Sequence, residues 1–379
     1  MKQGWTYKTL GDITTSMADG PFGSNLKKEH YTDKPEVRII QLSNIGEDGW
    51  REENTKYTTF EHLKNIQRSE VQPGDIVIAK MMPAGRAILC PSHEAKFVLS
   101  SDAVRATLIE GVNRRFVLYS INSPYFRKQV YENVSGSGRV RTSLTKLKAC
   151  RLLIPGINEQ ERIVERLDAA FAQIDELKSN AEKQLAEARA LFQSALKEML
   201  EPKEGWEIMK LGEFAYMKAG NFVKASEIFP DYKEGLYPCY GGNGFRGYVK
   251  EPNQNGDYCM IGRQGALCGC INRAQGIFRT TEHAVIVKPY KDIPTSLVYY
   301  MLVSLNLNKY ATGAAQPGLS VNNIAEAVII SVPPYDEQQH IADTLDSLKS
   351  KVDRLQENFN KMSQECDALK QALLRQIFE

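Results

Sequence analysis

Several features that would define a class of protein are missing from this sequence. No run of about 18 uninterrupted apolar residues occurs, so no membrane-spanning helix is expected. The seven cysteines form no CxxC pair, which argues against a disulfide framework and a zinc ribbon, and we predict no metal site. The first residues lack the apolar core of a secretory signal. We therefore expect a cytoplasmic protein with no membrane partner.

The sequence also has little that resembles an active site. The stretch SVPPY (331–335) is close to the Asp/Asn-Pro-Pro-Tyr motif of amino-methylating DNA methyltransferases, but Val332 stands where that motif needs a polar side chain. Residues 242–247 match GxGxxG, yet the stretch YVKEPNQNG (248–256) after them predicts a strand and a turn rather than the helix of a dinucleotide site. We predict no catalytic residue. A DNA methyltransferase in its own right is an alternative, although no cofactor loop is visible.

The balance of charge varies along the chain, although the formal net charge is only +2. Residues 1–150 carry a net charge of +6 and residues 207–330 a net charge of +2, whereas 151–206 and 331–379 each carry −3. Lys and Arg are the residues that bind phosphates. Basic bodies joined by acidic connectors therefore suit a protein that presents two surfaces to a polyanion.

A long internal repeat organises the sequence. GWTYKTLG (4–11) recurs as GWEIMKLG (205–212), and PGINEQERI (155–163) recurs as PPYDEQQHI (333–341). In the middle, PAGRAILC aligns with RQGALCGC, which pairs Gly85 with Gly265. The offset between the copies shortens along the chain, so the first copy carries some twenty extra residues before position 80. The two halves therefore share one plan.

Within each copy a β-rich part precedes a helical part. Runs such as VRIIQLSNI and GDIVIAK, separated by Gly, Pro and Asn, predict short strands and loops, and helical periodicity follows each P-x-x-x-EQ signal. We predict an α+β fold in which two similar globular domains are joined by two long coiled-coil helices. The predicted boundaries are 1–154 (first globular domain), 155–203 (first helix), 204–331 (second globular domain) and 332–379 (second helix).

Both helical segments carry a seam of residues at alternating spacings of four and three, as coiled coils do. Large side chains in the second seam and smaller ones in the first indicate that the helices pack together, most simply antiparallel, as a spacer of roughly 50 Å. Two amphipathic helices, each docked on its own domain, are the alternative. The predicted pairing residues are Ile163, Leu167, Ile174, Leu177, Ile341, Leu345, Val352, Leu355, Phe359 and Leu369.

Polar, glycine-rich loops are the candidates for binding. Arg, Gln and Asn can make bidentate contacts with base edges, and Lys, Ser and Thr can contact phosphates or bases. Any one such residue is more often a solvated surface residue. The candidate DNA-binding residues are Ser24, Asn25, Lys27, Arg139, Arg141 and Thr142 in the first half, and Asn243, Arg246, Arg263, Gln264, Gln316 and Ser320 in the second.

Taken together, these stretches resemble the specificity subunit of a type I restriction-modification system. The resemblance rests on the two GW-containing repeats, on DGPFGSNLK (19–27) and YPCYGGNGFRGY (237–248), and on the two P-x-x-x-EQ-x-x-I helix starts, and it covers essentially the whole chain. It implies two target recognition domains, each reading one half of an asymmetric bipartite site in double-stranded DNA. It also implies paired helices that bind two DNA methyltransferase subunits, which restriction (motor) subunits can join.

The resemblance further implies that the subunit itself is not catalytic and binds no cofactor. S-adenosylmethionine is expected on the methyltransferase, and ATP and Mg²⁺ on the motor subunit. KAGNFVKAS (218–226) stands where GPFGS is found in the first half, so contacts are not expected to map from one domain to the other. Two alternatives remain open: the same module serving another restriction architecture, and a two-headed coiled-coil scaffold that binds protein.

Overall fold

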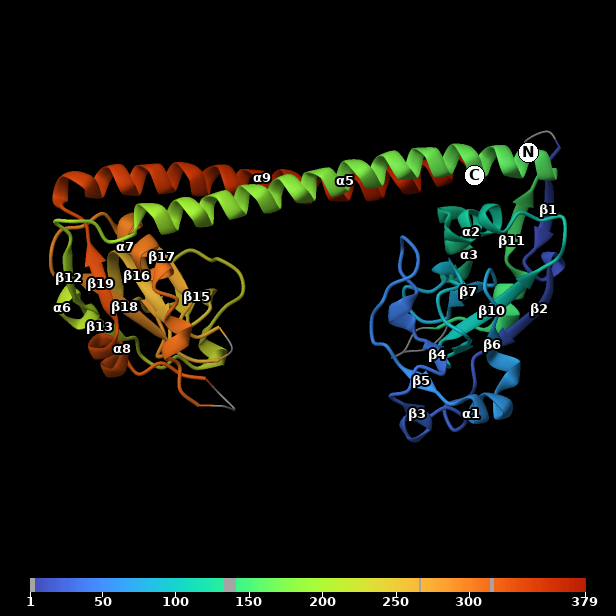
Figure 1. Ribbon diagram of the computed structural model, residues 1–379, viewed down its shortest axis with the longest axis horizontal. Helices are drawn as coiled ribbons and strands as arrows, with labels where there is room; N and C mark the ends of the chain where they lie inside the picture. Colours follow the sequence, from blue (N-terminus) through green and yellow to red (C-terminus); the bar gives the residue numbers. More distant parts are fainter. Residues whose placement is uncertain (1–3, 133–140, 266, 314–316) are drawn as a thin grey trace. The chain divides into compact units, whose positions relative to one another are not determined.

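The computed structural model describes residues 4–132, 141–265, 267–313 and 317–379 (Figure 1). The chain divides into two compact units, which we call unit 1 (residues 1–180 and 361–379) and unit 2 (residues 181–360). Two long helices, α5 (Ile157–Met199) and α9 (Tyr335–Phe378), each contribute to both units. No helix among the described residues is long and apolar enough to span a membrane. The four-part division derived from the sequence stays a prediction.

Unit 1 contains two sheets and a separate strand pair. The four-stranded sheet has the order β2-β10-β7-β8, the five-stranded sheet the order β3-β5-β4-β9-β6, and β1 pairs antiparallel with β11. The strands are β1 (Thr6–Thr9), β2 (Thr14–Asp19), β3 (Tyr31–Thr32), β4 (Val37–Ile40), β5 (Tyr57–Thr58), β6 (Glu70–Val71), β7 (Ile76–Ala79), β8 (Ala87–Leu89), β9 (Phe97–Leu99), β10 (Ala103–Leu108) and β11 (Arg151–Ile154). The helices besides α5 and α9 are α1 (Phe60–Asn65), α2 (Arg114–Asn122), α3 (Pro124–Glu132) and α4 (Leu144–Ala149).

Buried strands and capped helices follow from the local sequence of unit 1. Every side chain of β4 and β7 is buried, and these strands fall in VRIIQLSNI and GDIVIAK, so both predicted strands are confirmed. Helix α2 begins after Asn113, whose side-chain oxygen accepts hydrogen bonds from the backbone N–H of Arg115 (2.9 Å) and Phe116 (3.1 Å). The C-terminal turn of α9 completes this core, because the Phe378 ring lies 5.3 Å from that of Phe116.

Unit 2 is built around one six-stranded sheet with the order β13-β18-β16-β17-β14-β15, and β12 pairs antiparallel with β19. The strands are β12 (Glu207–Lys210), β13 (Ala215–Ala219), β14 (Tyr237–Gly241), β15 (Gly244–Val249), β16 (Gln254–Gly262), β17 (Ile271–Thr280), β18 (Ala284–Pro289) and β19 (Ile329–Val332). The helices besides α5 and α9 are α6 (Leu211–Phe214), α7 (Thr295–Ser304) and α8 (Val321–Ala327). Strand β15 runs through the GxGxxG match to Val249, so the prediction of a strand rather than a helix there is confirmed.

The two units share one strand plan. The order β2-β10-β7-β8 in unit 1 corresponds to β13-β18-β16-β17 in unit 2. The backbone N–H of Leu10 donates to Cys150 O over 2.8 Å, and that of Leu211 donates to Val328 O over the same distance. The predicted α+β fold with an internal duplication is thereby confirmed.

The units differ in the segment that follows the first strand of this plan. Residues 20–75 of unit 1 hold β3 to β6 and α1, whereas the shorter segment 220–253 of unit 2 holds the β14–β15 hairpin. This segment contains the extra residues that the shortening offset indicated.

One predicted pairing within the repeat was wrong. The N–H of Gly85 donates to Ala79 O (2.9 Å), and the N–H of Gly269 donates to Gly262 O (2.7 Å). Both glycines have a positive φ, 84° and 88°. Gly85 therefore corresponds to Gly269 rather than to Gly265, because the loops after β7 and β16 differ in length.

The P-x-x-x-EQ signal has a structural explanation at both helix starts. Gln160 donates from Nε2 to Pro155 O over 2.9 Å, and Gln338 donates in the same way to Pro333 O over 3.0 Å. Both glutamines are buried, so each bond fixes the direction in which a long helix leaves the preceding strand. Val332 is the last residue of β19, with Pro333 and Pro334 between it and α9.

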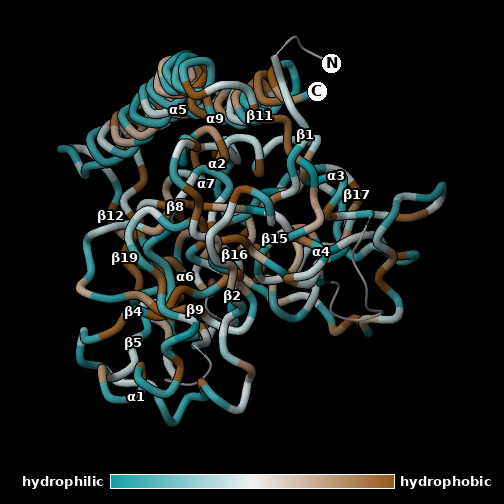
Figure 2. The backbone as a smooth tube through the Cα atoms, turned by 90° about the vertical axis from the view of Figure 1, so that its right-hand side faces the viewer, coloured by the Kyte–Doolittle hydropathy of each residue, from teal (hydrophilic) through white to brown (hydrophobic). Residues whose placement is uncertain are grey.

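The long helices run antiparallel in each unit, as the sequence predicted. In unit 1, Lys178 lies 3.2 Å from Asp367 and Lys370 lies 2.6 Å from Asp175. In unit 2, Arg189 donates to Gln356. Figure 2 shows hydrophilic and hydrophobic residues alternating along both helices, as expected of amphipathic helices.

The register of the helix seam differs from the prediction. Ile163, Leu167, Ile174, Ile341 and Leu345 are buried and Val352 and Phe359 are half-buried, but Leu177, Leu355 and Leu369 are exposed. Their C-terminal neighbours Lys178, Gln356 and Lys370 are the more buried residues.

The physical reason is the helical period. A strict seven-residue repeat drifts by about 20° per heptad relative to a straight α-helix. The helix starts are fixed by their globular units, so the seam moves one residue along the chain. The prediction that Leu177, Leu355 and Leu369 lie in the seam was wrong.

Candidate nucleic-acid interface

Two candidate residues of unit 2 lie on the hairpin of β14 and β15, Asn243 in its turn and Arg246 within β15, and both are exposed. The turn is held against the end of β16 by a close backbone approach. A Cβ atom on Gly262 would lie 1.9 Å from Gly242 O, so only glycine fits there. The thiol of Cys270 donates to the same Gly242 carbonyl over 2.8 Å. The two side chains therefore project from a well-supported hairpin.

Arg263 and Gln264 directly follow β16 and lie at the same end of the sheet. The N–H of Arg263 donates to His283 O over 3.0 Å, and a Cβ on Gly242 would lie 3.7 Å from Arg263 N. Gln264 pairs with Gly318 in an isolated bridge, and Arg263 O accepts from Leu319 N over 2.8 Å. The structure thus brings Asn243, Arg246, Arg263 and Gln264 together.

Ser320 follows Leu319 at the start of α8, is exposed and makes no side-chain cap hydrogen bond. It therefore lies beside the same cluster. Gln316 lies outside the described residues.

Polar atoms near this turn favour a charged or polar ligand. Arg263 Nε and Thr281 Oγ1 are buried and have no hydrogen-bond partner among the described residues. Such groups are normally satisfied by a ligand or by solvent. Burial raises the pKa of the Tyr240 phenol and of the Cys270 thiol, so both remain neutral near pH 7. The arginines are therefore the charged groups of this cluster that could meet a polyanion.

The candidates Ser24, Asn25 and Lys27 of unit 1 lie on the loop after β2, and all three are exposed. The loop is anchored on α1, because His62 Nε2 donates to Asn25 O over 2.8 Å. The His62 ring stacks on His30, with 4.0 Å between the ring centroids, and His30 Nδ1 accepts from Lys27 N over 3.0 Å. The loop offers a cation and two polar side chains on a defined backbone.

Arg141 and Thr142 lie beside the end of β7. Thr142 N donates to Lys80 O over 2.9 Å, and Arg141 is bridged to Met81 and exposed. The side chain of Thr142 is only 5% exposed, which argues against the base contact that we expected from it. Arg139 lies outside the described residues.

Lys80 is a cation that the sequence interpretation missed. The backbone N–H of Lys80 donates to Asp102 O over 2.8 Å, and the backbone N–H of Arg263 donates in the same way to His283 O. The two cations therefore occupy corresponding positions. The Lys80 ammonium lies 2.6 Å from Asp19 Oδ1. The incorrect pairing of Gly85 with Gly265 concealed this correspondence, because it aligned Arg263 with Pro83.

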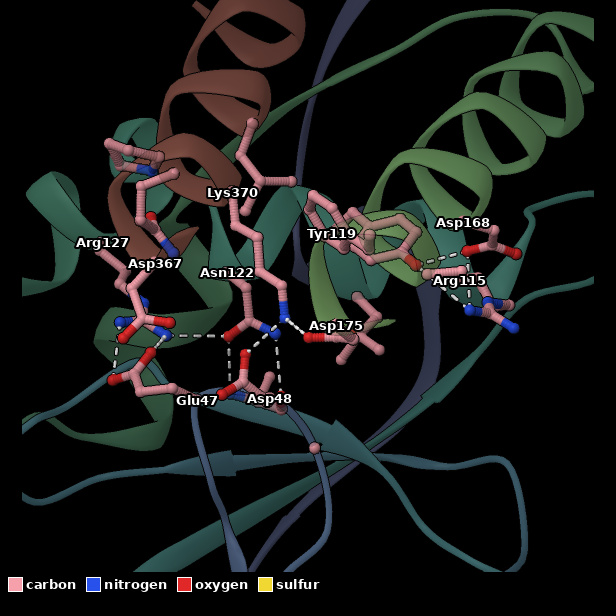
Figure 3. Close-up of a pocket in the computed structure, with 18 of the residues that line it drawn as sticks. Glu47, Asp48, Arg115, Tyr119, Asn122, Arg127, Asp168, Asp175, Asp367 and Lys370 are labelled. Carbon is pink, nitrogen blue, oxygen red and sulfur yellow. Dashed lines mark hydrogen bonds and ion pairs between the residues drawn. The ribbon is translucent and has the colours of Figure 1, made fainter. Parts of the chain in front are cut away.

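Unit 1 also has a cleft of about 1230 Å³ between its helix pair and its globular part (Figure 3). Several of its charged residues pair with one another: Lys370 with Asp48 (3.0 Å) and Asp175 (2.6 Å), and Arg127 with Glu47 (2.6 Å). Burial lowers the pKa of Lys370, but its hydrogen bonds to Asp175 and Asp48 outweigh that effect and leave it raised. These pairs hold the loop of Glu47 and Asp48 against the helices, which is a structural role.

No group of three or more His, Cys, Asp or Glu that could hold a metal ion occurs within the ranges that the structure describes. What the two units have in common is a sheet end that presents cationic and amide side chains. The two units share one strand order and differ in the segment inserted after its first strand. This combination is that of a two-domain recognition protein.

Comparison with known proteins agrees with this class. A family model described as the type I restriction modification DNA specificity domain matches residues 2–187 and 203–361. The chain therefore belongs to that family and contains its domain twice. The expected role as a DNA specificity subunit of a type I restriction-modification system is confirmed at this level.

Individual relatives show the extent of the similarity. The chain is 43% identical over 148 residues to the type I restriction enzyme EcoprrI specificity subunit of Escherichia coli, a match that spans 39% of this chain and 37% of that protein. It is 21% identical over 438 residues to the EcoKI specificity subunit of Escherichia coli strain K12, covering 100% of this chain and 89% of that protein.

Two solved structures share the fold. One is a chain from a structure of a type I restriction-modification system, with a TM-score of 0.77 at 18% identity over 99% of this chain and 97% of the other. The second is the HsdS subunit from Thermoanaerobacter tengcongensis, with a TM-score of 0.53 at 18% identity over 100% of this chain and 97% of the other.

Proposed function

We propose that this chain recognises an asymmetric bipartite site in double-stranded DNA, with one half-site read by each unit. The observation that carries the proposal is the contrast between a shared frame and different inserts. Unit 1 presents the loop of Ser24, Asn25 and Lys27 together with a five-stranded sheet, and unit 2 presents the β14–β15 hairpin with Asn243 and Arg246. Different side chains on equivalent supports would read different base pairs.

We also propose that the helix pair docks two copies of a DNA methyltransferase subunit, to which restriction subunits can add. Four leucines support this: Leu177, Leu191, Leu355 and Leu369 are 54%, 65%, 38% and 50% exposed. The repeat that aligns Gln160 with Gln338 also aligns Leu177 with Leu355 and Leu191 with Leu369.

Each unit contributes one leucine from each helix. The Lys178–Asp367 contact places Leu177 and Leu369 at one level of the pair in unit 1, and the Arg189–Gln356 contact does the same for Leu191 and Leu355 in unit 2. Two equivalent apolar surfaces suit two copies of one partner.

The chemistry is assigned to those partners. S-adenosylmethionine would bind to the methyltransferase subunits, and ATP and Mg²⁺ to the motor subunits, while this chain supplies specificity without catalysis. In support, Val332 of the SVPPY stretch is buried in β19 and paired with Glu207, which is a structural position. The cytoplasm, where chromosomal DNA lies, is the proposed location.

The test is sequencing that detects methyladenine in cells that express the methyltransferase with and without this chain. We expect methylation of one asymmetric motif with a fixed internal gap only when the chain is present. The Arg246→Ala variant should then relax the sequence requirement in one half-site and leave the other unchanged. Methylation that is the same with and without the chain would contradict the proposal.

A protein-binding scaffold would give a different result, because its binding to duplex DNA would not fall steeply with salt as phosphate contacts require. The same specificity module serving another restriction architecture would keep the methylated motif but recruit a different nuclease. Purification of the complex from cells that restrict unmethylated DNA distinguishes that case.

A further inference from the structure

The two units each expose one phenylalanine at a corresponding position. Phe22 is 79% exposed and Phe222 is 68% exposed. Phe22 lies two residues after Gly20, which directly follows β2. Phe222 lies two residues after Gly220, which directly follows β13. The sequence GPFGS has no complete counterpart in unit 2, but the Gly-x-Phe part of it recurs.

Hydrogen bonds establish that these positions correspond. Gly20 N donates to Ala103 O over 3.0 Å, and Gly220 N donates to Ala284 O over 3.1 Å. Ala103 and Ala284 are the first residues of β10 and β18, which occupy the same place in the shared strand order.

Both glycines lie very close to the backbone of the segment that precedes the neighbouring strand, β10 or β18. A Cβ on Gly20 would lie 1.7 Å from Ser100 O, and a Cβ on Gly220 would lie 2.2 Å from Thr280 O. Neither position can accept a side chain without movement of the backbone. The backbone is therefore fixed two residues before each phenylalanine.

A single exposed aromatic side chain is common on a protein surface and needs no explanation. Here the same side chain recurs in two halves whose following segments differ in length and in fold. A feature shared by both units on otherwise divergent segments indicates a task that both units perform, independent of the bases that each reads.

The surroundings indicate the ligand. Lys27 and Lys28 lie on the same loop as Phe22 and are exposed, and exposed Lys224 follows Phe222. Asp19, next to Gly20, is paired with Lys80, the cation that corresponds to Arg263. An aromatic side chain among cations is suited to a nucleic acid, where the cations meet phosphates and the ring meets a base. A protein partner would be better served by a continuous apolar patch.

We propose that Phe22 and Phe222 each contact a base or base step of the duplex, one in each half-site, as equivalent apolar anchors that do not select sequence. This proposal rests on the proposed function. Apolar side chains that wedge against base steps position a protein on DNA. The divergent segments then read the bases, while the two phenylalanines add affinity common to both half-sites.

The test uses the assembled complex of this chain with its methyltransferase subunits. The probe is a fluorescent duplex that carries the motif found by methyladenine sequencing, with 2-aminopurine placed in turn at each half-site. The variants are Phe22→Ala, Phe222→Ala and the double variant. Matched controls are Tyr7→Ala in β1 of unit 1 and Tyr290→Ala in unit 2, both exposed aromatic residues. Tyr290 follows Pro289, at the end of β18 away from Ala284.

Each single variant should weaken binding about tenfold, because each removes one apolar contact with a base step of the duplex. The 2-aminopurine signal should change only in the half-site of the altered unit, and the methylated motif should stay the same. The control variants should bind as the unaltered complex does. Since all four side chains are exposed, thermal unfolding should be unchanged.

Three outcomes would overturn the inference. Binding equal to that of the unaltered complex would show that the rings do not contact DNA. Loss of co-elution with the methyltransferase would show that they contact protein. A changed motif would show that they select sequence. In all three cases the unaltered complex still binds its bipartite duplex, so the proposed function stands; failure of the unaltered complex to bind would reject both.

Discussion

Tyr300 donates a hydrogen bond from its phenol to Asp346 Oδ1 over 2.7 Å and so joins α7 to α9. Tyr119 makes the corresponding bond to Asp168 and joins α2 to α5. In each unit, one tyrosine thus ties a globular part to the long helix that leaves it. Each bond therefore helps to hold a long helix against the globular part of the same unit.

Tyr300→Phe should destabilise unit 2 by about 1–3 kcal/mol, because it removes a largely buried hydrogen bond to a charged group. Burial and the bond to Asp346 raise the pKa of Tyr300 above its ordinary 10.0. The neutral phenol is therefore favoured in the folded state, and this contribution to stability is complete below pH 10 and is lost as the pH rises further.

Urea unfolding at pH 8 and pH 10.5 checks both parts of this prediction. The difference in stability between the original chain and Tyr300→Phe should shrink at the higher pH. Other buried tyrosines and cysteines also titrate there, so the comparison is between the two proteins at each pH. An equal difference at both pH values would mean that the phenol is not held neutral by Asp346.

Gly20→Ala should destabilise unit 1 by about 1–3 kcal/mol, the usual cost of forcing extra volume into a packed site. The new Cβ would lie 1.7 Å from Ser100 O. Gly23→Ala is the matched control three residues later, where a Cβ meets nothing within 4 Å. Chemical denaturation should show a loss for the first variant and little change for the second. Equal stability of the two variants would refute the close approach.

Pro294→Asn should stabilise unit 2 by about 0.5–1 kcal/mol. In unit 1, Asn113 at the start of α2 donates its N–H to Gln160 Oε1 (2.9 Å) and caps the helix with its side chain. At the start of α7 the corresponding residue is Pro294, which has no N–H, and Gln338 Oε1 is buried without a partner in the described part of the chain.

Asparagine would supply both the missing bond and a cap, together about 1–2 kcal/mol, less about 0.4–1 kcal/mol for the rigidity of proline in the unfolded chain. The reverse exchange, Asn113→Pro, should destabilise unit 1. Melting temperatures of both variants check the pair. A loss of stability in Pro294→Asn would show that the site cannot accommodate the asparagine.

The fold could be predicted from the sequence because the motifs that indicate it occur in both halves of the chain. The GW-containing repeats, the two buried glutamines at the helix starts and the β-rich runs each have a direct structural counterpart. The helix seam could be predicted only in part. Leucine is the usual seam residue, so the heptad spacing predicts Leu355 and Leu369 in the seam rather than Gln356 and Lys370. Lys370 is tolerated in the seam because Asp175 and Asp48 pair with it, and such long-range pairs cannot be seen in the sequence.

The candidate site, too, could be predicted only in part from the sequence. Residue types identified loops of the right chemistry, and the structure gathers Asn243, Arg246, Arg263 and Gln264 at one end of a sheet. Residue type alone could not tell that Thr142 is buried, since that depends on the packing of segments distant in sequence. Nor could it identify Lys80, whose correspondence to Arg263 is defined by backbone hydrogen bonds after β7 and β16.

The exposed leucines give the last prediction. Leu355→Asp would disrupt the helix pair if Leu355 lay in the seam, but its exposure leads to a different expectation. The variant should fold with little loss of stability, because a charge at an exposed position can remain hydrated. It should nevertheless weaken assembly with the methyltransferase, since it places a charge on an apolar docking surface.

Leu345→Asp is the matched control, because Leu345 is fully buried in the core of unit 2. A buried, unpaired carboxylate should unfold unit 2 or cost several kcal/mol. Circular dichroism and co-purification of the methyltransferase separate the two cases. If Leu355→Asp unfolded the chain as Leu345→Asp does, the seam would include Leu355 after all; if it folded and assembled normally, the leucine pairs would not be the docking surface.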